Sequence, residues 1–190
     1  IDDRALGAPR QRHGQDEDNA EGLLNGHRDR PLTDLGQRQA AEVAHLIHER
    51  HGAEIDAVLC SPLQRARSTA ETIASRLGKE VRVHHDLIER DFGVLTGRPF
   101  ADITTLATAT LPTEKVLYFL EAEGAENFDV LRLRAERVVQ TLTAEFGAEK
   151  TVLCVCHGDI WKMLLAVRRG VTWRDALLSP YIANTDVIVL

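Results

Sequence analysis

Short apolar stretches of strand length alternate with amphipathic stretches of helix length along most of the chain. Residues 55–60 (IDAVLC) and 151–156 (TVLCVC) are almost continuously apolar, which is typical of strands buried on both faces of a parallel sheet. Residues 34–50 and 127–146 instead place apolar side chains three and four positions apart, as one face of a helix requires. This alternation predicts an α/β fold, a three-layer sandwich with a mostly parallel central sheet and helices on both faces.

A further helix is predicted directly after the first of these strands. Ser61 is a good N-cap, Pro62 suits the first helical position, and Gln64 completes a capping box. Apolar side chains then recur on one face up to Leu77, and Gly78 supplies a C-terminal stop. The loop between this strand and helix is a candidate site, because active sites of such sheets lie at the carboxyl ends of the strands.

Shorter elements complete the predicted sandwich. Residues 81–84 and 186–190 have the composition of strands, and residues 160–169 and 173–178 have that of helices.

The residues before His13 interrupt the pattern. Gly7 and Pro9 weaken any strand, and Arg10 and Gln11 are costly to bury. We therefore expect either a first strand that is short and lies at an edge of the sheet, or an N-terminal end of unusual sequence.

A second interruption covers residues 94–130. Within it, residues 101–124 have helical propensity but contain Pro112 and Gly124, so we expect an interrupted helix that serves as a lid or specificity insertion. A chain of 190 residues is short for two ordinary domains. We therefore expect one domain over residues 1–190.

Charge and composition narrow the class of partner. The chain has 23 Lys and Arg against 29 Asp and Glu, a formal net charge of -6, and no basic stripe, so no nucleic-acid partner is expected. No apolar run reaches the length of about 18 residues that a membrane helix needs, so no membrane partner is expected. The 3 cysteines form no disulfide framework, which favours the cytoplasm. The oligomeric state stays open, with a homodimer as one alternative.

Four short motifs with chemical potential occur along the chain. They are Arg12-His13-Gly14, Ser61-Pro62-Leu63-Gln64-Arg65-Ala66, Glu89 ahead of Phe92-Gly93, and His157-Gly158 directly after an apolar strand. Each motif is weak evidence alone, but their order and spacing together are specific. Over residues 12–190 the chain resembles the histidine phosphatase superfamily, also called the phosphoglycerate mutase-like family, and in particular its phosphatase branch.

These residue types suit the chemistry of a phosphomonoester. Such a group carries about two negative charges, so its pocket needs cations and hydrogen-bond donors. Arg12 and Arg65 can each bind phosphoryl oxygens through two N–H groups, and the helix N-terminus near Arg65 also favours an anion. A neutral histidine nitrogen can attack phosphorus and form a phosphohistidine, which divides one difficult step into two easier ones.

The resemblance implies a role for each of these residues. His13 is the expected nucleophile, His157 is expected to donate to the phosphoryl oxygens, and Glu89 is expected to protonate the leaving alkoxide and then deprotonate water. A glutamate with both tasks needs a pKa nearer neutrality, which burial can supply. The resemblance further implies that the substrate or its phosphate contacts Asn19, Gln15, Asn25, Gly26 and Gly158. It implies no metal and no cofactor.

Three functions are compatible with this resemblance. The first is a metal-independent phosphatase that acts on a small phosphorylated metabolite through a phosphohistidine. The second is a phosphotransferase of the phosphoglycerate mutase type, and the third is a catalytically weak member that binds a phosphorylated ligand or a protein. Mutases of the family carry a longer basic, proline-rich insertion after the glutamate. Here Lys115 is the only basic residue between positions 101 and 130, which favours hydrolysis.

Two other clusters have simpler structural interpretations. His45, His48 and His51 recur along a predicted helix without a metalloprotease pattern, so we expect a solvated helix face rather than a metal site. Cys154 and Cys156 occupy alternate positions of one strand, so we expect them to pack in the core.

Overall fold

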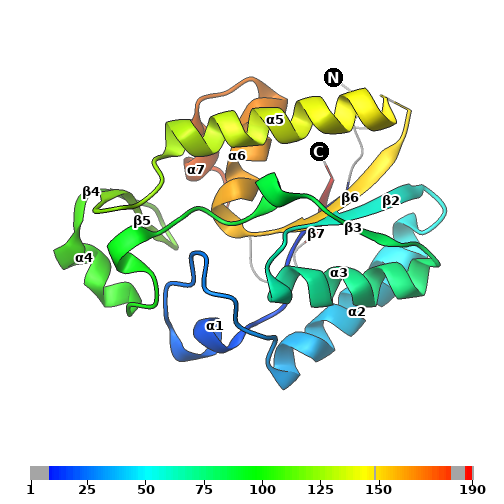
Figure 1. The fold of residues 1–190 in the computed structure, drawn as a ribbon, viewed down its shortest axis with the longest axis horizontal. Coiled ribbons are helices and arrows are strands. Elements are labelled where there is room, and N and C mark those ends of the chain that lie inside the picture. The colour runs from blue at the N-terminus through cyan, green and yellow to red at the C-terminus, as the bar shows by residue number, and fades with distance from the viewer. Residues whose placement is uncertain (1–8, 148, 181–186, 190) are drawn as a thin grey trace.

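The structure is a computed structural model that describes residues 9–147, 149–180 and 187–189 (Figure 1). For residues 9–12 and 187–189 it describes the backbone, so the side chain of Arg12 lies outside the described part. The segment before Pro9 and the outer residues of the last predicted strand also lie outside it.

The described part of the chain places five strands in a central sheet, in the order β3-β2-β6-β1-β7. Strands β1, β2, β3 and β6 run parallel, and β7 pairs antiparallel with β1. The predicted, mostly parallel sheet is therefore confirmed. The strand bounds are β1 Pro9–Arg12, β2 Ile55–Cys60, β3 Val81–Val83, β6 Thr151–Cys156 and β7 Val187–Val189.

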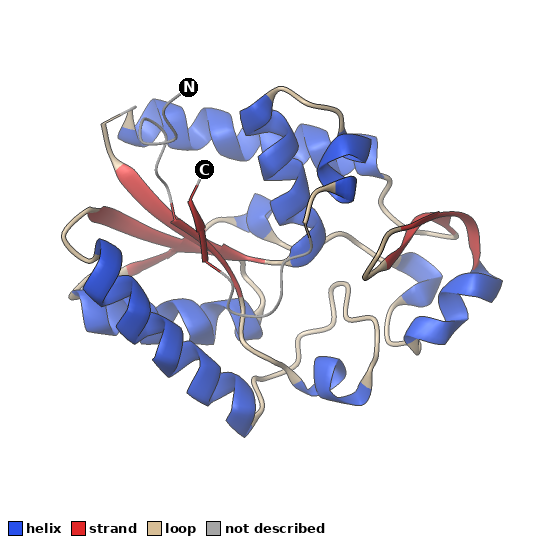
Figure 2. Ribbon diagram, turned by 180° about the vertical axis from the view of Figure 1, so that it is seen from behind, coloured by secondary structure: helices blue, strands red, loops and turns tan. Residues whose placement is uncertain are grey.

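Helices cover both faces of the sheet, as predicted (Figures 1 and 2). One face carries α2 (Asp34–His51) and α3 (Gln64–Leu77), and the other carries α5 (Phe128–Phe146), α6 (Gly158–Arg169) and α7 (Trp173–Leu178). The two layers meet opposite sides of β6. Leu153 and Val155 belong to the apolar cluster under α2 and α3, whereas Cys154 and Cys156 belong to the cluster under α5 and α6.

Both simple interpretations of the histidine and cysteine clusters agree with the structure. Cys154 and Cys156 are fully buried on one side of β6. On α2, His45 and His48 are exposed and His51 is half-buried, and His45 lies 3.2 Å from the Glu49 carboxylate. This face of α2 is therefore a solvated helix face.

The structure corrects the expected position of the first strand. Strand β1 lies inside the sheet rather than at its edge, because β7 pairs along its outer side and places Val189 opposite Pro9. Pro9 is tolerated because it is the first residue of the strand. On the inner side Arg12 lies opposite Cys156, so the chain reaches His13 beside the carboxyl end of β6.

The beginning of α3 also differs from the expectation. The helix begins at Gln64 after Leu63, and Ser61 does not cap it. Instead, the backbone N–H of Gln64 donates to the carboxylate of Asp29 at 2.6 Å. This partner is distant in sequence, so no local pattern reveals it. The predicted end of the helix at Gly78 is confirmed, with a left-handed φ of 64° at that glycine.

Half of residues 101–124 form β structure in place of the expected interrupted helix. Strands β4 (Ala107–Pro112) and β5 (Leu117–Ala122) pair antiparallel as a hairpin, and α4 (Ile103–Leu106) with a 3₁₀ turn at Phe100–Asp102 precedes them. Half-buried and exposed residues alternate along β4, which is the pattern of a strand with one covered face. Threonine and aromatic residues favour such a surface, and this packing outweighs the helical propensity.

The remaining short elements surround the carboxyl edge of the sheet. They are α1 (Glu17–Glu21) and two 3₁₀ turns, His85–Leu87 and Gly93–Leu95. In Figure 1, α1 and the β4–β5 hairpin both lie beyond the carboxyl ends of the parallel strands. These segments therefore surround the edge of the sheet at which the sequence motifs converge.

Candidate active site

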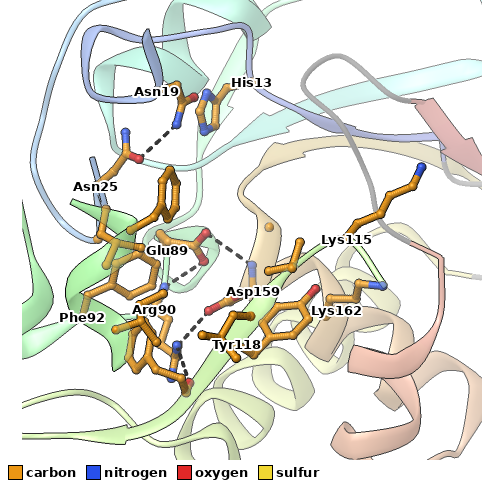
Figure 3. A pocket seen from close by; sticks show the side chains of 18 of the residues that line it. His13, Asn19, Asn25, Glu89, Arg90, Phe92, Lys115, Tyr118, Asp159 and Lys162 are labelled. Atoms are coloured by element: carbon orange, nitrogen blue, oxygen red, sulfur yellow. Dashed lines mark hydrogen bonds and ion pairs between the residues drawn. The ribbon is translucent and has the colours of Figure 1, made fainter. Parts of the chain in front are cut away.

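A cavity of about 420 Å³ lies between the carboxyl edge of the sheet and the β4–β5 hairpin (Figure 3). It brings together residues from motifs that are far apart in the sequence. The residues of the sequence-based set that line it are His13, Asn19, Asn25, Gly26, Arg65, Glu89 and Gly158.

His13 is buried directly after β1 and is held by both backbone and side-chain contacts. Its backbone N–H donates to the Cys156 carbonyl at 3.3 Å, which ties it to the end of β6. Its Nδ1 lies 2.7 Å from the Gly14 carbonyl oxygen, and because a carbonyl can only accept, Nδ1 carries the proton. Arg65 Nε donates to the other nitrogen, Nε2, at 3.2 Å. The lone pair of the ring is therefore on Nε2.

His157 follows β6 and lies against His13, with ring centroids 5.0 Å apart. Arg65 Nε also donates to His157 Nδ1, at 3.3 Å, so the neutral ring carries its proton on Nε2. That Nε2 lies 2.7 Å from the Ser61 hydroxyl. Ser61 thus orients the second histidine, and this role explains why it is buried instead of capping α3.

Arg65 is the centre of the site and is 1% exposed. Its terminal nitrogens donate to the carbonyl oxygens of Arg28, at 2.6 Å, and Gly26, at 3.0 Å, while Nε serves both histidines. The carboxylate of Asp16 lies 3.3 Å from the same Nε. The guanidinium is therefore fixed in position by the protein and neutralised by one buried carboxylate.

Asp16 organises the asparagines of the site, and sequence reasoning missed it. It accepts from Asn25 Nδ2 at 2.5 Å and from the Asn19 backbone N–H at 2.8 Å, and Asn19 Nδ2 in turn donates to Asn25 Oδ1 at 3.1 Å. Burial raises the pKa of Asp16, although the nearby Arg65 charge and these hydrogen bonds oppose the rise. The only sequence signal for such a residue is that a buried arginine needs a counter-charge.

Glu89 lies at the N-terminus of α6, inside the cavity. The backbone N–H groups of Arg90, Ile160 and Asp159 donate to its carboxylate at 2.9, 3.1 and 3.3 Å. Burial raises the pKa of Glu89, the Asp159 carboxylate raises it further, and the three N–H donors lower it in part. A buried carboxyl of this kind can hold a proton nearer neutral pH than an ordinary glutamate.

Arg90 and Asp159 form a second buried pair beside Glu89, which sequence reasoning also missed. Arg90 Nε donates to Asp159 Oδ2 at 2.8 Å, and another guanidinium nitrogen donates to the Phe119 carbonyl at 3.0 Å. The guanidinium carbon lies 3.8 Å from the ring centroid of Phe119 and 4.2 Å from that of Phe128. Arg90 is thus neutralised and stacked on aromatic rings beside the cavity.

Arg134 of α5 holds the segment that carries Glu89. It donates to the carbonyl oxygens of Asp86, at 2.9 Å, of Glu89, at 3.0 Å, and of Ile88. Its charge is paired with the Glu126 carboxylate at 2.7 Å. One arginine therefore holds the backbone of residues 86–89 next to the cavity.

The loop after His13 packs closely on the first turn of α2, and Gln15 supports this contact. The Gln15 side-chain oxygen accepts from the Thr33 hydroxyl at 2.9 Å, and its backbone N–H donates to the Gln39 side chain at 2.9 Å. A Cβ on Gly36 would lie 2.0 Å from the Gln15 carbonyl oxygen, so this position requires glycine. Gln15 is not among the described residues that line the cavity.

The described side chains, from residue 13 to 180 with a gap at 148, contain no group of three or more His, Cys, Asp or Glu placed to hold a metal ion. Among the helices that the structure describes, none has the length and apolar composition needed to cross a bilayer. The positive charge of the site comes from its arginines and lysines.

Comparison with known proteins places the chain in a family. Residues 11–190 match the histidine phosphatase superfamily (branch 1). The adenosylcobalamin/alpha-ribazole phosphatase of Escherichia coli (strain K12) is 31% identical over 157 residues, covering 82% of this chain and 75% of that protein. A 2,3-bisphosphoglycerate-dependent phosphoglycerate mutase of Methylorubrum populi is 30% identical over 169 residues, covering 85% and 78%. The structure of mycobacterial glucosyl-3-phosphoglycerate phosphatase superposes with a TM-score of 0.80 at 24% identity, covering 96% and 90%. The chain therefore belongs to the histidine phosphatase superfamily, branch 1, and the predicted phosphatase is confirmed.

Proposed function

We propose that this phosphatase hydrolyses small phosphomonoesters in two steps, through a phosphohistidine formed on Nε2 of His13. The observation that carries the proposal is the single Arg65 Nε–H, which donates to one nitrogen of His13 and one of His157. A phosphoryl oxygen bound by Arg65 accepts the Nε–H hydrogen bond in place of the two histidine nitrogens. The lone pair of His13 then points at phosphorus, and Nδ1 of His157 can accept a proton and donate it to a phosphoryl oxygen.

In the first step, His13 Nε2 attacks phosphorus and the ester P–O bond breaks. The leaving oxygen takes the proton of the Glu89 carboxyl group, so an alcohol departs and Glu89 becomes a carboxylate. The Nδ1–H of His13 continues to donate a hydrogen bond to the Gly14 carbonyl oxygen, and this bond stabilises the positive charge of the phosphorylated ring. Asn19 lines the same end of the cavity, where its amide can donate to the phosphoryl group.

In the second step, the Glu89 carboxylate takes a proton from a water molecule. The hydroxide attacks phosphorus, the P–N bond breaks, and its electron pair returns to His13 Nε2. Inorganic phosphate leaves, and Glu89 is again protonated for the next cycle. A raised pKa suits both tasks, because Glu89 must give and accept a proton in one cycle.

Substitution of the nucleophile tests this proposal. We expect His13→Ala to lower kcat/KM for 4-nitrophenyl phosphate by at least ~10⁴-fold, because the substitution removes the nitrogen proposed to attack phosphorus. His45→Ala removes an exposed histidine from α2 and serves as the matched control, with unchanged kcat/KM. If His13→Ala keeps most of the activity, another nucleophile or direct attack by water is the mechanism.

A phosphotransferase of the mutase type is the second candidate, because a mutase is among the relatives. It requires movement of a phosphoryl group between two positions of a sugar acid, stimulated by a bisphosphate. Lys115 and Lys162 are the lysines that line the cavity in the described part of the chain, and Lys115 is the only basic residue between positions 101 and 130. This sparse positive charge favours hydrolysis, and we expect no such exchange in an assay with and without bisphosphate.

The setting of the activity is part of the proposal. We place the enzyme in the cytoplasm, because its three cysteines are buried thiols in the sheet, and we expect no nucleic-acid partner for a chain of net charge -6. Residues 1–190 form one domain in this account, and residues 94–130 form the wall that selects the substrate. A homodimer remains a prediction, which a measurement of molecular mass in solution would test.

A further inference from the structure

The end of the cavity away from His13 is lined mainly by apolar side chains. Leu24, Phe92 and Phe119 belong to one buried cluster, and Phe100, Val116 and Leu117 add further apolar surface from the 3₁₀ turn and the hairpin. These residues surround the place where the alcohol portion of a phosphomonoester lies if its phosphoryl group is bound at His13.

Of the three cations at this end, Lys162 and Arg90 have most of their donors engaged by the protein. Lys162 donates all three of its N–H groups to the backbone and side-chain oxygens of Ser179 and to the Pro180 carbonyl, each at 2.8 Å. Arg90 is paired with Asp159 and stacked on phenylalanines, and only its Nη1 has no hydrogen-bond partner among the described atoms. Lys115 is exposed at the turn of the hairpin.

The arrangement of polar and apolar side chains at this end determines which leaving groups the cavity binds favourably. A leaving group with several hydroxyls or a second phosphate would lose its hydration with few donors in return. An apolar ring would lose little hydration and would cover the apolar wall, in which the Phe100 ring is exposed. We propose that the substrates are monophosphates of apolar, ring-bearing alcohols or phenols, an inference that rests on the proposed phosphatase function.

Phe100 is the residue that tests this inference best. Its ring lines the cavity but is 52% exposed, so the protein core does not depend on it. Its backbone N–H donates to the Gly22 carbonyl at 3.2 Å, and this bond is kept when the side chain is changed. Leu133 of α5 is a matched control, because it is 55% exposed and does not line the cavity.

The first experiment compares 3-phenylpropyl phosphate with glycerol 3-phosphate. Both are primary alkyl esters, so the bond that breaks is of the same kind, and the leaving groups differ in polarity and in the apolar area that they can bury. We expect kcat/KM to be at least about tenfold higher for the phenylpropyl ester. Phe100→Ala should lower this preference by about threefold or more, because kcat/KM falls for the phenylpropyl ester and not for glycerol 3-phosphate. Leu133→Ala should leave the preference unchanged. Equal rates, or a preference for glycerol 3-phosphate, overturn the inference while the phosphatase function stands.

A binding experiment separates this inference from the proposed function. Calorimetry with 3-phenylpropylphosphonate and methylphosphonate needs no turnover, and we expect the phenylpropyl compound to bind about tenfold more tightly. If no ester is hydrolysed but this selectivity is present, the proposed function is wrong and the apolar subsite is correct. If the two phosphonates bind with equal affinity, the apolar subsite is wrong.

Discussion

Two buried carboxylates, one behind the cavity and one in its wall, are each paired with one buried arginine. Asp16 is paired with Arg65 at the phosphoryl end, and Asp159 is paired with Arg90 near Glu89. A carboxylate at such a place opposes the substrate charge, so each must serve the residue beside it. Asp16 fixes Arg65, the arginine proposed to bind phosphate, and Asp159 adds negative charge beside Glu89, the proposed acid and base.

Asp16→Asn tests the first of these pairs. The amide has the shape of the carboxylate but leaves the Arg65 charge buried without its counter-charge, so we expect a loss of about 3 kcal/mol in the free energy of unfolding. Inorganic phosphate supplies the missing charge, so it should raise the melting temperature more in the variant than in the unchanged protein. An equal rise in both proteins would show that Asp16 does not neutralise Arg65.

Asp159→Asn tests the second pair through the pH dependence of activity. The Asp159 charge raises the pKa of Glu89, so its removal lowers that pKa. Glu89 donates a proton in the first step, and activity therefore falls as the pH rises through its pKa. The alkaline limb of kcat/KM for an alkyl phosphate should move to lower pH in the variant.

The leaving group provides the control for this pH experiment. 4-Nitrophenolate departs without protonation, so the alkaline limb for 4-nitrophenyl phosphate should move much less. Asp34→Asn, which changes an exposed first-turn residue of α2, should leave both limbs unchanged. An alkaline limb of kcat/KM that does not move for the alkyl ester would show that Asp159 does not set the pKa of Glu89.

Among the elements, α5 and α6 position the acid from two sides. The N-terminus of α6 holds the Glu89 carboxylate through backbone N–H groups, and Arg134 of α5 holds the Glu89 carbonyl together with those of Asp86 and Ile88. The side chain and the backbone of one residue are thus fixed by different helices. Precise placement of an acid is worth much of its catalytic effect.

Arg134→Met tests this positioning by α5. The loss of hydrogen bonds to the Glu89 segment, with Glu126 left unpaired, should lower the free energy of unfolding by about 3 kcal/mol. It should also lower kcat for alkyl phosphates by about tenfold, with a smaller effect on 4-nitrophenyl phosphate, because only the alkyl leaving group needs the acid. Arg134→Lys should lose less of the free energy of unfolding and less of kcat for alkyl phosphates than Arg134→Met. If kcat falls equally for both substrates, Arg134 does not act through Glu89.

The elements that sequence reasoning predicted well are those specified by local patterns. The apolar strands β2 and β6 and the amphipathic helices α2 and α5 were predicted because their burial periodicity is contained in a few consecutive residues. The cap of α3 by Asp29 and the cover of β1 by β7 depend on partners that are distant in sequence, so no local window contains them. The hairpin at residues 107–122 pairs locally, and it was not predicted because packing on its covered face outweighs its helical propensity.

The same distinction holds for the site. His13, Arg65, Glu89 and His157 were found because short motifs carry them. Asp16, Asp159, Arg90 and Arg134 were missed because their significance comes from burial beside another charge, which appears only after folding. Gln15 was expected in the substrate pocket, whereas its side chain bonds to Thr33.

At the scale of the whole molecule, a net negative chain gathers cations around its cavity, and two of them are paired with buried carboxylates. The formal charge is -6, yet the described residues that line the cavity include four cations (Arg65, Arg90, Lys115 and Lys162) and two carboxylates (Glu89 and Asp159). The sheet delivers the reactive groups at its carboxyl edge, and the hairpin closes the opposite side with apolar surface. In the proposed account the phosphoryl group lies at the carboxyl edge of the sheet, and the leaving group lies against the apolar surface of the hairpin.

The central claim is that the reaction passes through a phosphoryl group bound to His13. Incubation with a ³²P-labelled phosphomonoester, followed by rapid denaturation in alkali, should leave up to about one label per chain. The label should be stable in alkali, be released in acid, and be absent from His13→Ala. Turnover by the unchanged enzyme without any trapped label, or equal labelling of His13→Ala, would contradict the account.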